Sequence, residues 1–214
     1  TVESVTSGHP DKVCDQISDA VLDAFLEQDP KSRVAVETFG SSGLIVVGGE
    51  VTSKGTVDVP LLVKKIYKEI GYKDKPKIVV NISKQSPDIA MGVDADGAGD
   101  QGIMYGYATD ETPELLPLPV VLAHNLTKGL ENLRRKNVKF SWLKPDGKSQ
   151  VTVEGRKVTA VVVSCQHDEK IELPEIRELV TKKLIRPVVG PGNYQILINP
   201  TGRFVTGGFT ADTG

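Results

Sequence analysis

VDVPLLVKKIYKEI, at residues 57–70, recurs in altered form as IELPEIRELVTKKL at residues 171–184. An offset of 114 residues (174 − 60) brings the proline and five apolar residues of each stretch into coincidence. In both copies the apolar spacing predicts an amphipathic helix that begins near the proline. We interpret the match as an internal duplication with units of about a hundred residues. The alternative is a chance similarity between two amphipathic strand–helix units.

The sequence around the two stretches predicts the same order of elements twice. One helical pattern runs from Val13 until Asp29 and Pro30 stop it, and a longer one covers residues 119–137. The first is followed by two strands at 33–39 and 43–51, the amphipathic helix at 59–72 and a last strand at 77–83. The second is followed by two strands within 149–165, the amphipathic helix at 174–185 and a last strand at 195–199. We expect an α+β fold of two units, residues 1–116 and 117–214, with interwoven edges. Each unit is expected to be a mixed β-sheet with helices on one face.

The composition is that of an ordinary globular chain. Of the 214 residues, 39% are hydrophobic and 25% are charged, and the net charge is −2. This balance does not indicate a nucleic-acid or membrane partner. The two cysteines, Cys14 and Cys165, imply no disulfide framework, so we expect a reducing, cytoplasmic setting. No signal peptide or membrane-length apolar stretch is visible.

The string GHPDK, at residues 8–12, combines a helix start with groups that suit phosphate chemistry. Pro10 is favoured at the first helical position, Asp11 complements the positive end of the helix dipole, and the free N–H groups there attract anions. His9 adds a protonatable ring, Asp11 a hard ligand for Mg²⁺ and Lys12 an ammonium group. The string indicates a site for a polyphosphate and its metal ion. The plainer interpretation is a capped helix with a surface histidine.

A glycine-rich string, GAGDQG at residues 97–102, matches the spacing of a dinucleotide-binding loop. Such a loop needs a β-branched strand before it and a helix after it, and neither pattern flanks this string. We therefore interpret it as a flexible loop that presents Asp100 and Gln101 to a ligand, or as a solvated turn.

Five strings occur here in the order in which S-adenosylmethionine synthetases, also called methionine adenosyltransferases, carry them. They are GHPDK, KQSPDIAMGVD, GAGDQGIMYGYATDE, LKPDGKSQVTVE and NPTGRFVTGG. The chain resembles this family over essentially all of residues 1–214. The resemblance implies an architecture of three α+β units around a pseudo-threefold axis, of which about two are present. It also implies formation of S-adenosylmethionine from ATP and L-methionine, with release of pyrophosphate and phosphate and with Mg²⁺ and K⁺ as cofactors.

In that reaction the methionine sulfur displaces the whole triphosphate from the 5′ carbon of ATP, so positioning and electrostatic stabilisation dominate. By resemblance, His9 contacts the phosphates near the breaking bond, Lys148 binds phosphate and Asp11 is a Mg²⁺ ligand. Asp146 corresponds to a nucleotide contact. The catalytic residues are expected to be His9, Lys148 and, in the substrate pocket, Asp100.

Further substrate contacts are also implied by the resemblance. Arg203 and Phe204 correspond to ATP-binding residues, and Phe204 would stack on adenine. Asp212 corresponds to a contact of both substrates. Glu50 and Gln85 correspond to methionine-binding residues.

Glu37 resembles a ligand of the monovalent cation, and Glu3 a residue that reaches the active site of a partner subunit. From the strand pattern alone, Glu37 and Glu50 are also consistent with solvent-facing positions. His124 and His167 have no companions at metal-ligand spacing, so we expect them to be structural. The role of Glu3, with apolar strand faces at 44–51 and 158–163, predicts a homodimer or a dimer of dimers with active sites at the interface.

Three departures from the family pattern bear on activity. The sequence ends at Gly214, where the family continues into segments that supply further cations and a second metal-binding carboxylate. The stretch between Asp94 and Gly97 is shorter than the family's gating segment, and Phe209 stands where relatives usually place proline. The second hypothesis is therefore a catalytically silent, truncated homologue that acts as a nucleotide-binding or assembly subunit.

Overall fold

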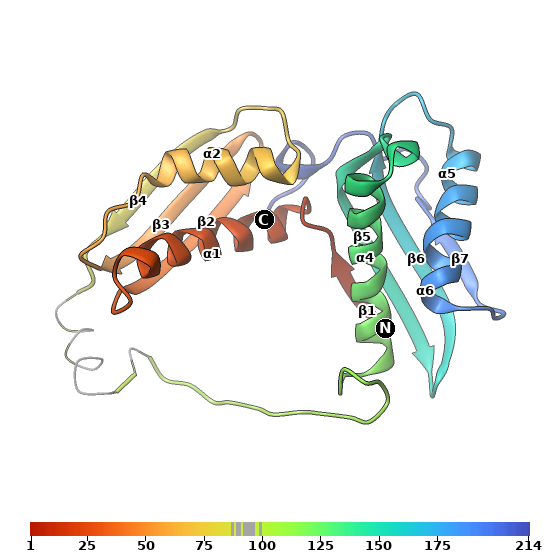
Figure 1. The fold of residues 1–214 in the computed structure, drawn as a ribbon, viewed down its shortest axis with the longest axis horizontal. Coiled ribbons are helices and arrows are strands. Elements are labelled where there is room, and N and C mark those ends of the chain that lie inside the picture. The colour runs from red at the N-terminus through yellow and green to blue at the C-terminus, as the bar shows by residue number, and fades with distance from the viewer. Residues whose placement is uncertain (87, 89–90, 92–96, 99) are drawn as a thin grey trace.

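The structure is a computed structural model that describes residues 1–86, 88, 91, 97–98 and 100–214. It has two α+β units that lie side by side, each a sheet with helices packed on one face (Figure 1). The expected fold class is confirmed. The short gating stretch between Asp94 and Gly97 lies mostly outside the described residues. No helix in the described part of the chain is long and apolar enough to cross a membrane.

The first unit is a three-stranded sheet of order β2-β3-β4 under two helices. The elements are α1 (Pro10–Gln28), β2 (Arg33–Ser41), β3 (Leu44–Thr52), α2 (Val59–Ile70) and β4 (Lys77–Ser83). Strands β2 and β3 are antiparallel, whereas β3 and β4 are parallel because α2 connects them. The apolar faces of α1 and α2 meet Val36, Ile45 and Val47 in one buried cluster.

The second unit is a four-stranded sheet of order β1-β5-β6-β7. Its elements are α4 (Leu118–Lys136), β5 (Leu143–Glu154), β6 (Lys157–His167), α5 (Leu173–Val180), a π-helical turn (Thr181–Ile185), α6 (Arg186–Val189) and β7 (Gln195–Ile198), joined by β1 (Val2–Val5). Strands β5 and β6 are antiparallel, and β6 and β7 are parallel. This arrangement repeats the first unit, as the duplicated stretches predict.

The buried residues of the repeated helices follow a register slightly different from that of the sequence match. Val63 and Tyr67 are buried in α2, and Ile176 and Val180 are buried in α5, an offset of 113 residues (176 − 63). The π-helical turn holds one residue more per turn than an α-helix. Because of this extra residue, the buried Leu184 corresponds to the buried Ile70 at the original offset of 114 residues (184 − 70).

Each end of the chain packs on the unit that is distant from it in sequence. Strand β1 was not predicted, and it pairs antiparallel with β5 of the second unit. At the other end, the backbone of Gly214 exchanges two hydrogen bonds with Gly40 of β2.

Strand β5 begins six residues before the predicted strand region, because its irregular start from Leu143 to Gly147 contains Pro145 and lacks an alternating pattern.

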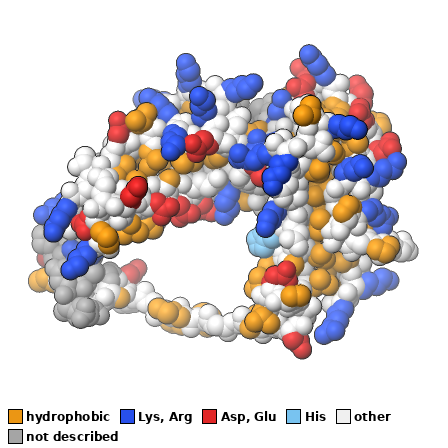
Figure 2. Space-filling view, viewed as in Figure 1, with side chains coloured by type: hydrophobic (Ala, Val, Ile, Leu, Met, Phe, Trp, Pro, Cys, Tyr) orange, Lys and Arg blue, Asp and Glu red, His pale blue; other side chains and the backbone are white. Residues whose placement is uncertain are grey.

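The link between the units, residues 100–117, contains no helix or strand and runs as an extended trace (Figure 1). Figure 2 shows an opening that the two units and this segment enclose. Large apolar side chains of the link face solvent: Ile103, Met104, Tyr105 and Tyr107 are all at least 75% exposed.

Candidate functional site

His9 caps the N-terminus of α1. Its backbone is extended, and its Nδ1 atom accepts a hydrogen bond from the backbone N–H of Asp11 at 3.3 Å. Gly8 is needed because a Cβ atom there would overlap Pro145 of β5. The GHPDK string therefore runs close against the second unit and forms the helix start that the sequence predicted.

Three carboxylates surround His9. The Nδ1 atom lies 3.6 Å from Oδ2 of Asp11, and the Nε2 atom lies 3.9 Å from Oδ2 of Asp212. The third carboxylate, that of Asp146, is buried and accepts a hydrogen bond from the Gly208 N–H at 2.8 Å. Burial raises the pKa of Asp146, against the opposing effects of the Gly208 N–H and of His9. A carboxylate that is costly to ionise thus lies beside two that face solvent.

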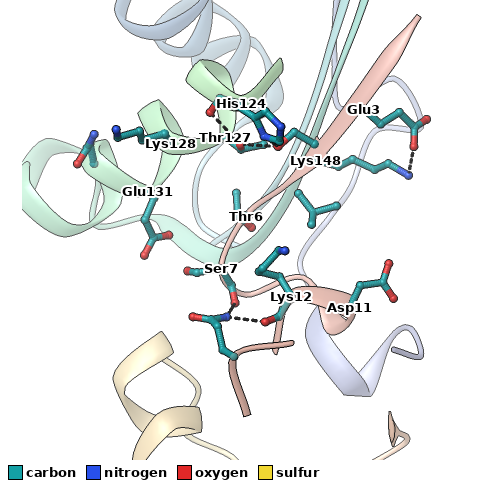
Figure 3. Close-up of a pocket in the computed structure, with 14 residues that line it drawn as sticks. Glu3, Thr6, Ser7, Asp11, Lys12, His124, Thr127, Lys128, Glu131 and Lys148 are labelled. Carbon is teal, nitrogen blue, oxygen red and sulfur yellow. Dashed lines mark hydrogen bonds and ion pairs between the residues drawn. The ribbon is translucent and has the colours of Figure 1, made fainter. Parts of the chain in front are cut away.

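A cavity of about 730 Å³ lies between the start of α1, strand β1 and helix α4 (Figure 3). Asp11, Lys12 and Lys148 line it, as does Glu3, whose Oε2 atom is 2.6 Å from the Lys148 ammonium nitrogen. The Ser4 side chain of β1 contacts α4, so it points to the face of the sheet that the helices cover. Because neighbouring side chains of a strand point to opposite faces, Glu3 lies on the face that the helices leave uncovered. The structure therefore brings the predicted metal ligand, phosphate lysine and inter-subunit residue to one cavity.

Helix α4 supplies a wall of this cavity that sequence analysis did not predict. Lys128 faces the cavity one helical turn after His124. The His124 Nδ1 atom is 3.0 Å from the Ser4 hydroxyl, which also lies 2.9 Å from the Thr127 hydroxyl. The only available signal was the four-residue spacing of His124 and Lys128, which places both on one helix face.

Tyr72 joins the GHPDK string to the end of the chain, and it too was not predicted. Its hydroxyl donates a hydrogen bond to the Gly8 carbonyl oxygen. Gly208 has φ = +61°, and a Cβ atom there would lie 2.5 Å from the same hydroxyl. Phe209 is buried and stacks on Tyr67, with 6.0 Å between ring centroids. These contacts hold the segment that carries Asp212 against the first unit.

Arg203 and Phe204 lie in the loop after β7. The Arg203 guanidinium pairs with Glu169 at 3.1 Å, and both side chains are exposed. The backbone of Phe204 exchanges hydrogen bonds with His167, whose Nε2 atom accepts from the Phe204 N–H at 3.1 Å. His167 Nδ1 is 2.8 Å from the Asp168 carbonyl oxygen. The ring of His167 thus fixes the loop that presents Phe204.

The residues expected to bind methionine and the monovalent cation lie on the first unit. Glu50 is paired in register with Ser83 at the end of β4, and Gln85 follows two residues later. The Gln85 Oε1 atom is buried and has no hydrogen-bond partner among the described residues. Glu37 lies on edge strand β2 beside a hollow of about 290 Å³. Asp100 is exposed, and its carboxylate accepts a hydrogen bond from the Gln101 N–H.

The geometry suits a cation that brings part of its own coordination shell. Within the described ranges, no group of three or more His, Cys, Asp or Glu side chains is positioned to hold a metal ion. Mg²⁺ commonly takes one or two carboxylates and completes its shell with phosphate oxygens and waters. The Asp11 side chain, 67% exposed, is free to act in this way.

Two family models match the chain. The N-terminal domain of S-adenosylmethionine synthetase matches residues 1–91, and the central domain matches residues 95–204. The chain belongs to the S-adenosylmethionine synthetase family. The resemblance drawn from the five strings is thereby confirmed.

Curated relatives of the family extend beyond this chain. It is 48% identical to S-adenosylmethionine synthases of Thermus thermophilus and Desulforudis audaxviator, with all of the chain covered but only 62% of each relative. The match to the Sorangium cellulosum enzyme, also 48% identical, covers 56% of that relative. The Thermus alignment has 247 positions against 214 residues in the chain, so 33 positions of the relative have no counterpart here.

Proposed function

We propose that the chain acts in the synthesis of S-adenosylmethionine from ATP and L-methionine, with release of pyrophosphate and phosphate. The observation that carries the proposal is the placement of GHPDK: Asp11, whose carboxylate lies 3.6 Å from the His9 ring, lines the cavity that Lys148 also lines. The reaction requires that sulfur and 5′ carbon be held in line and that charge on the departing triphosphate be neutralised. A helix start and lysine ammonium groups meet the second requirement.

Each residue near GHPDK has a proposed part in binding ATP. His9 hydrogen-bonds a phosphate oxygen close to the breaking bond, and Lys148 leaves Glu3 to pair with the triphosphate. Asp146, held by the Gly208 N–H, contacts the nucleoside. Asp212 contacts both substrates.

The loop after β7 supplies the adenine contacts in this proposal. Phe204 stacks on the ring, and Arg203 exchanges its surface pairing with Glu169 for a contact to ATP. Stacking on an aromatic side chain suits a planar base.

Methionine is proposed to bind where Glu50 and Gln85 end the first sheet, with Asp100 closing the substrate pocket. The buried Oε1 atom of Gln85, which has no hydrogen-bond partner among the described residues, supports this assignment as an acceptor for the methionine ammonium group. The carboxylate of Glu50 lies at the same end of the sheet.

Two cations belong to the proposal, Mg²⁺ at Asp11 and K⁺ at Glu37. When bound, Mg²⁺ neutralises triphosphate charge. Asp11 fits this role because it is exposed and adjoins the phosphate groups proposed for His9 and Lys148. Asp15 and Asp19 of α1 line the same hollow as Glu37 and offer oxygen ligands of the type that hard cations prefer. Because the described carboxylates do not form a group that holds an ion by itself, K⁺ is proposed to complete its shell with water.

We also propose a homodimer, alone or as half of a dimer of dimers, with active sites shared across the interface. Phe39, Val46 and Val79 are direct cross-strand neighbours on the face of the first sheet that the helices leave uncovered. Phe39 and Val79 are 50% and 37% exposed. An apolar row of this kind is typical of a surface that a partner covers.

Calorimetry with a non-hydrolysable ATP analogue and Mg²⁺ tests the ATP site. Lys148→Ala is expected to weaken binding by about 1.5–3 kcal/mol, the value of a charge-assisted contact. Lys157→Ala is the matched control, because Lys157 is an exposed lysine of the neighbouring strand β6. Equal affinities of the two variants would refute the phosphate role of Lys148. Analogue binding without adenosyl transfer would favour the catalytically silent homologue.

Light scattering across a dilution series, with activity measured in parallel, tests the shared site. In the dimer, Glu3 is proposed to leave the Lys148 of its own chain and to act in the partner's site. Glu3→Ala and Asp11→Ala chains are therefore each expected to be inactive, and their mixture is expected to regain part of the activity. A fully active monomer would refute the dimer proposal.

A further inference from the structure

A second cavity, of about 590 Å³, lies on the outside of the first unit, where α2 ends and β4 begins. Of the residues that the structure describes, none lines both this cavity and the one beside GHPDK. Its volume is within the range of small-molecule sites. Lys and Arg side chains gather along the α2 edge of the unit (Figure 2).

The lining of this cavity combines an aromatic wall with a basic rim. Tyr67 is buried and stacks on Tyr72, with 4.8 Å between ring centroids and 17° between planes. Around them the lining includes four lysines that form no ion pair in the described part of the chain: Lys64, Lys68, Lys73 and Lys75. Among the described lining residues the one acidic side chain is that of Asp74, which accepts a hydrogen bond from the Tyr67 hydroxyl at 2.9 Å.

We propose that this cavity binds a small ligand that joins a planar aromatic ring to a phosphate group. Tyr67 and Tyr72, together with Val63, Pro76 and Ile78 of the lining, offer apolar area to a planar group. The four lysine ammonium groups concentrate positive charge at the rim, where a phosphate dianion would gain charge-assisted hydrogen bonds. Nucleoside monophosphates belong to this class of ligand.

The cavity connects to the GHPDK string through one side chain. Tyr72, which lines the cavity, donates its hydroxyl hydrogen to the Gly8 carbonyl oxygen next to His9. The same hydroxyl lies against Gly208, whose N–H holds Asp146. A ligand that moves the Tyr72 ring therefore changes the surroundings of His9. This coupling does not depend on the reaction proposed for the other cavity.

Titration of the isotope-labelled chain with phenyl phosphate, followed by NMR, tests the binding site. Amide signals of residues 63–78 are expected to shift. Lys68→Gln/Lys73→Gln is expected to weaken binding about tenfold, as loss of a charge-assisted contact predicts. Lys65→Gln/Lys77→Gln is the matched control, since both lysines are exposed and do not line the cavity. Lys65 lies on α2 with Lys68, and Lys77 begins β4 directly after the loop that carries Lys73.

Three results would overturn the binding proposal: equal affinities of the two double variants, inorganic phosphate binding as tightly as phenyl phosphate, or loss of binding in Lys148→Ala. The last would place the ligand in the cavity beside GHPDK. The coupling has its own readout in the ring signals of His9, one of three histidines. They are expected to shift on saturation of the wild type and not of Tyr72→Phe. An equal shift in both proteins would refute coupling through the Tyr72 hydroxyl.

Discussion

Substitution of Gly40 by alanine tests how the end of the chain is held on the first unit. Gly40 lies in β2, and a Cβ atom there would overlap the ring of Phe209. The ring has little room to move, because it is 1% exposed and stacks on Tyr67. The backbone of Gly40 also exchanges two hydrogen bonds with Gly214.

The expected magnitudes follow from these contacts. Overpacking by one methyl group costs about 1–3 kcal/mol of unfolding free energy, so Gly40→Ala is expected to fall in that range. Removing the buried ring by Phe209→Ala is expected to cost about 3–5 kcal/mol. In the double variant the new methyl group meets no ring, so its cost is expected to be close to that of Phe209→Ala alone. The two substitutions should therefore couple by about 1–3 kcal/mol.

Urea unfolding followed by circular dichroism measures all four free energies of this cycle. The wild type and the three variants should share one m-value, which shows that the substitutions act on the folded state. Additive costs, within about 0.5 kcal/mol, would refute the packing of Phe209 against Gly40.

Three further predictions concern charges and thiols. Arg134→Ala is expected to lower the free energy of unfolding, measured in urea, by about 3 kcal/mol, because it leaves the partly buried Glu131 with one arginine partner fewer. Arg135→Ala is expected to cost only about 0–1 kcal/mol, because the Arg135 side chain is 47% exposed. Burial alone would raise the pKa of Glu131, but the two arginines outweigh it and lower that pKa. The stabilisation from ionised Glu131 should be fully present above its unfolded pKa of about 4.3 and be lost as the pH falls through its lower folded pKa. An unfolding free energy that does not change with pH in this acidic range would contradict the prediction. Burial raises the pKa of Cys14 to about 11 and that of Cys165 to about 12, so both should react slowly with a thiol reagent at pH 8 until urea unfolds the chain.

Helices and strands with strong apolar periodicity were predictable from the sequence. Helix α1, helix α2 and strand β4 begin and end within a few residues of the predicted positions. Strand β1 was not predictable, because its four residues carry too short a pattern and are ordered by pairing with β5, more than a hundred residues away.

The candidate site likewise contains residues that the sequence predicted and residues that it did not. The chemistry of His9 and Asp11 follows from local sequence, since the string itself starts a helix. Tyr72 and Lys128 gave no comparable signal. Tyr72 acquires its part only through a hydrogen bond to Gly8, 64 residues earlier, and Lys128 only through the packing of α4 beside β1.

The sequence by itself determined the family, the duplicated α+β units and the residue types at the site, because motifs and periodicity are local properties of the chain. Only the tertiary structure decided which of these residues meet. It joined Glu3 to Lys148, placed Asp212 beside His9 and set Tyr72 in the wall of the second cavity with its hydroxyl on the Gly8 carbonyl oxygen. Such pairings depend on strand register and on the close approach of glycine backbones, which arise when the two units pack and exchange their terminal segments.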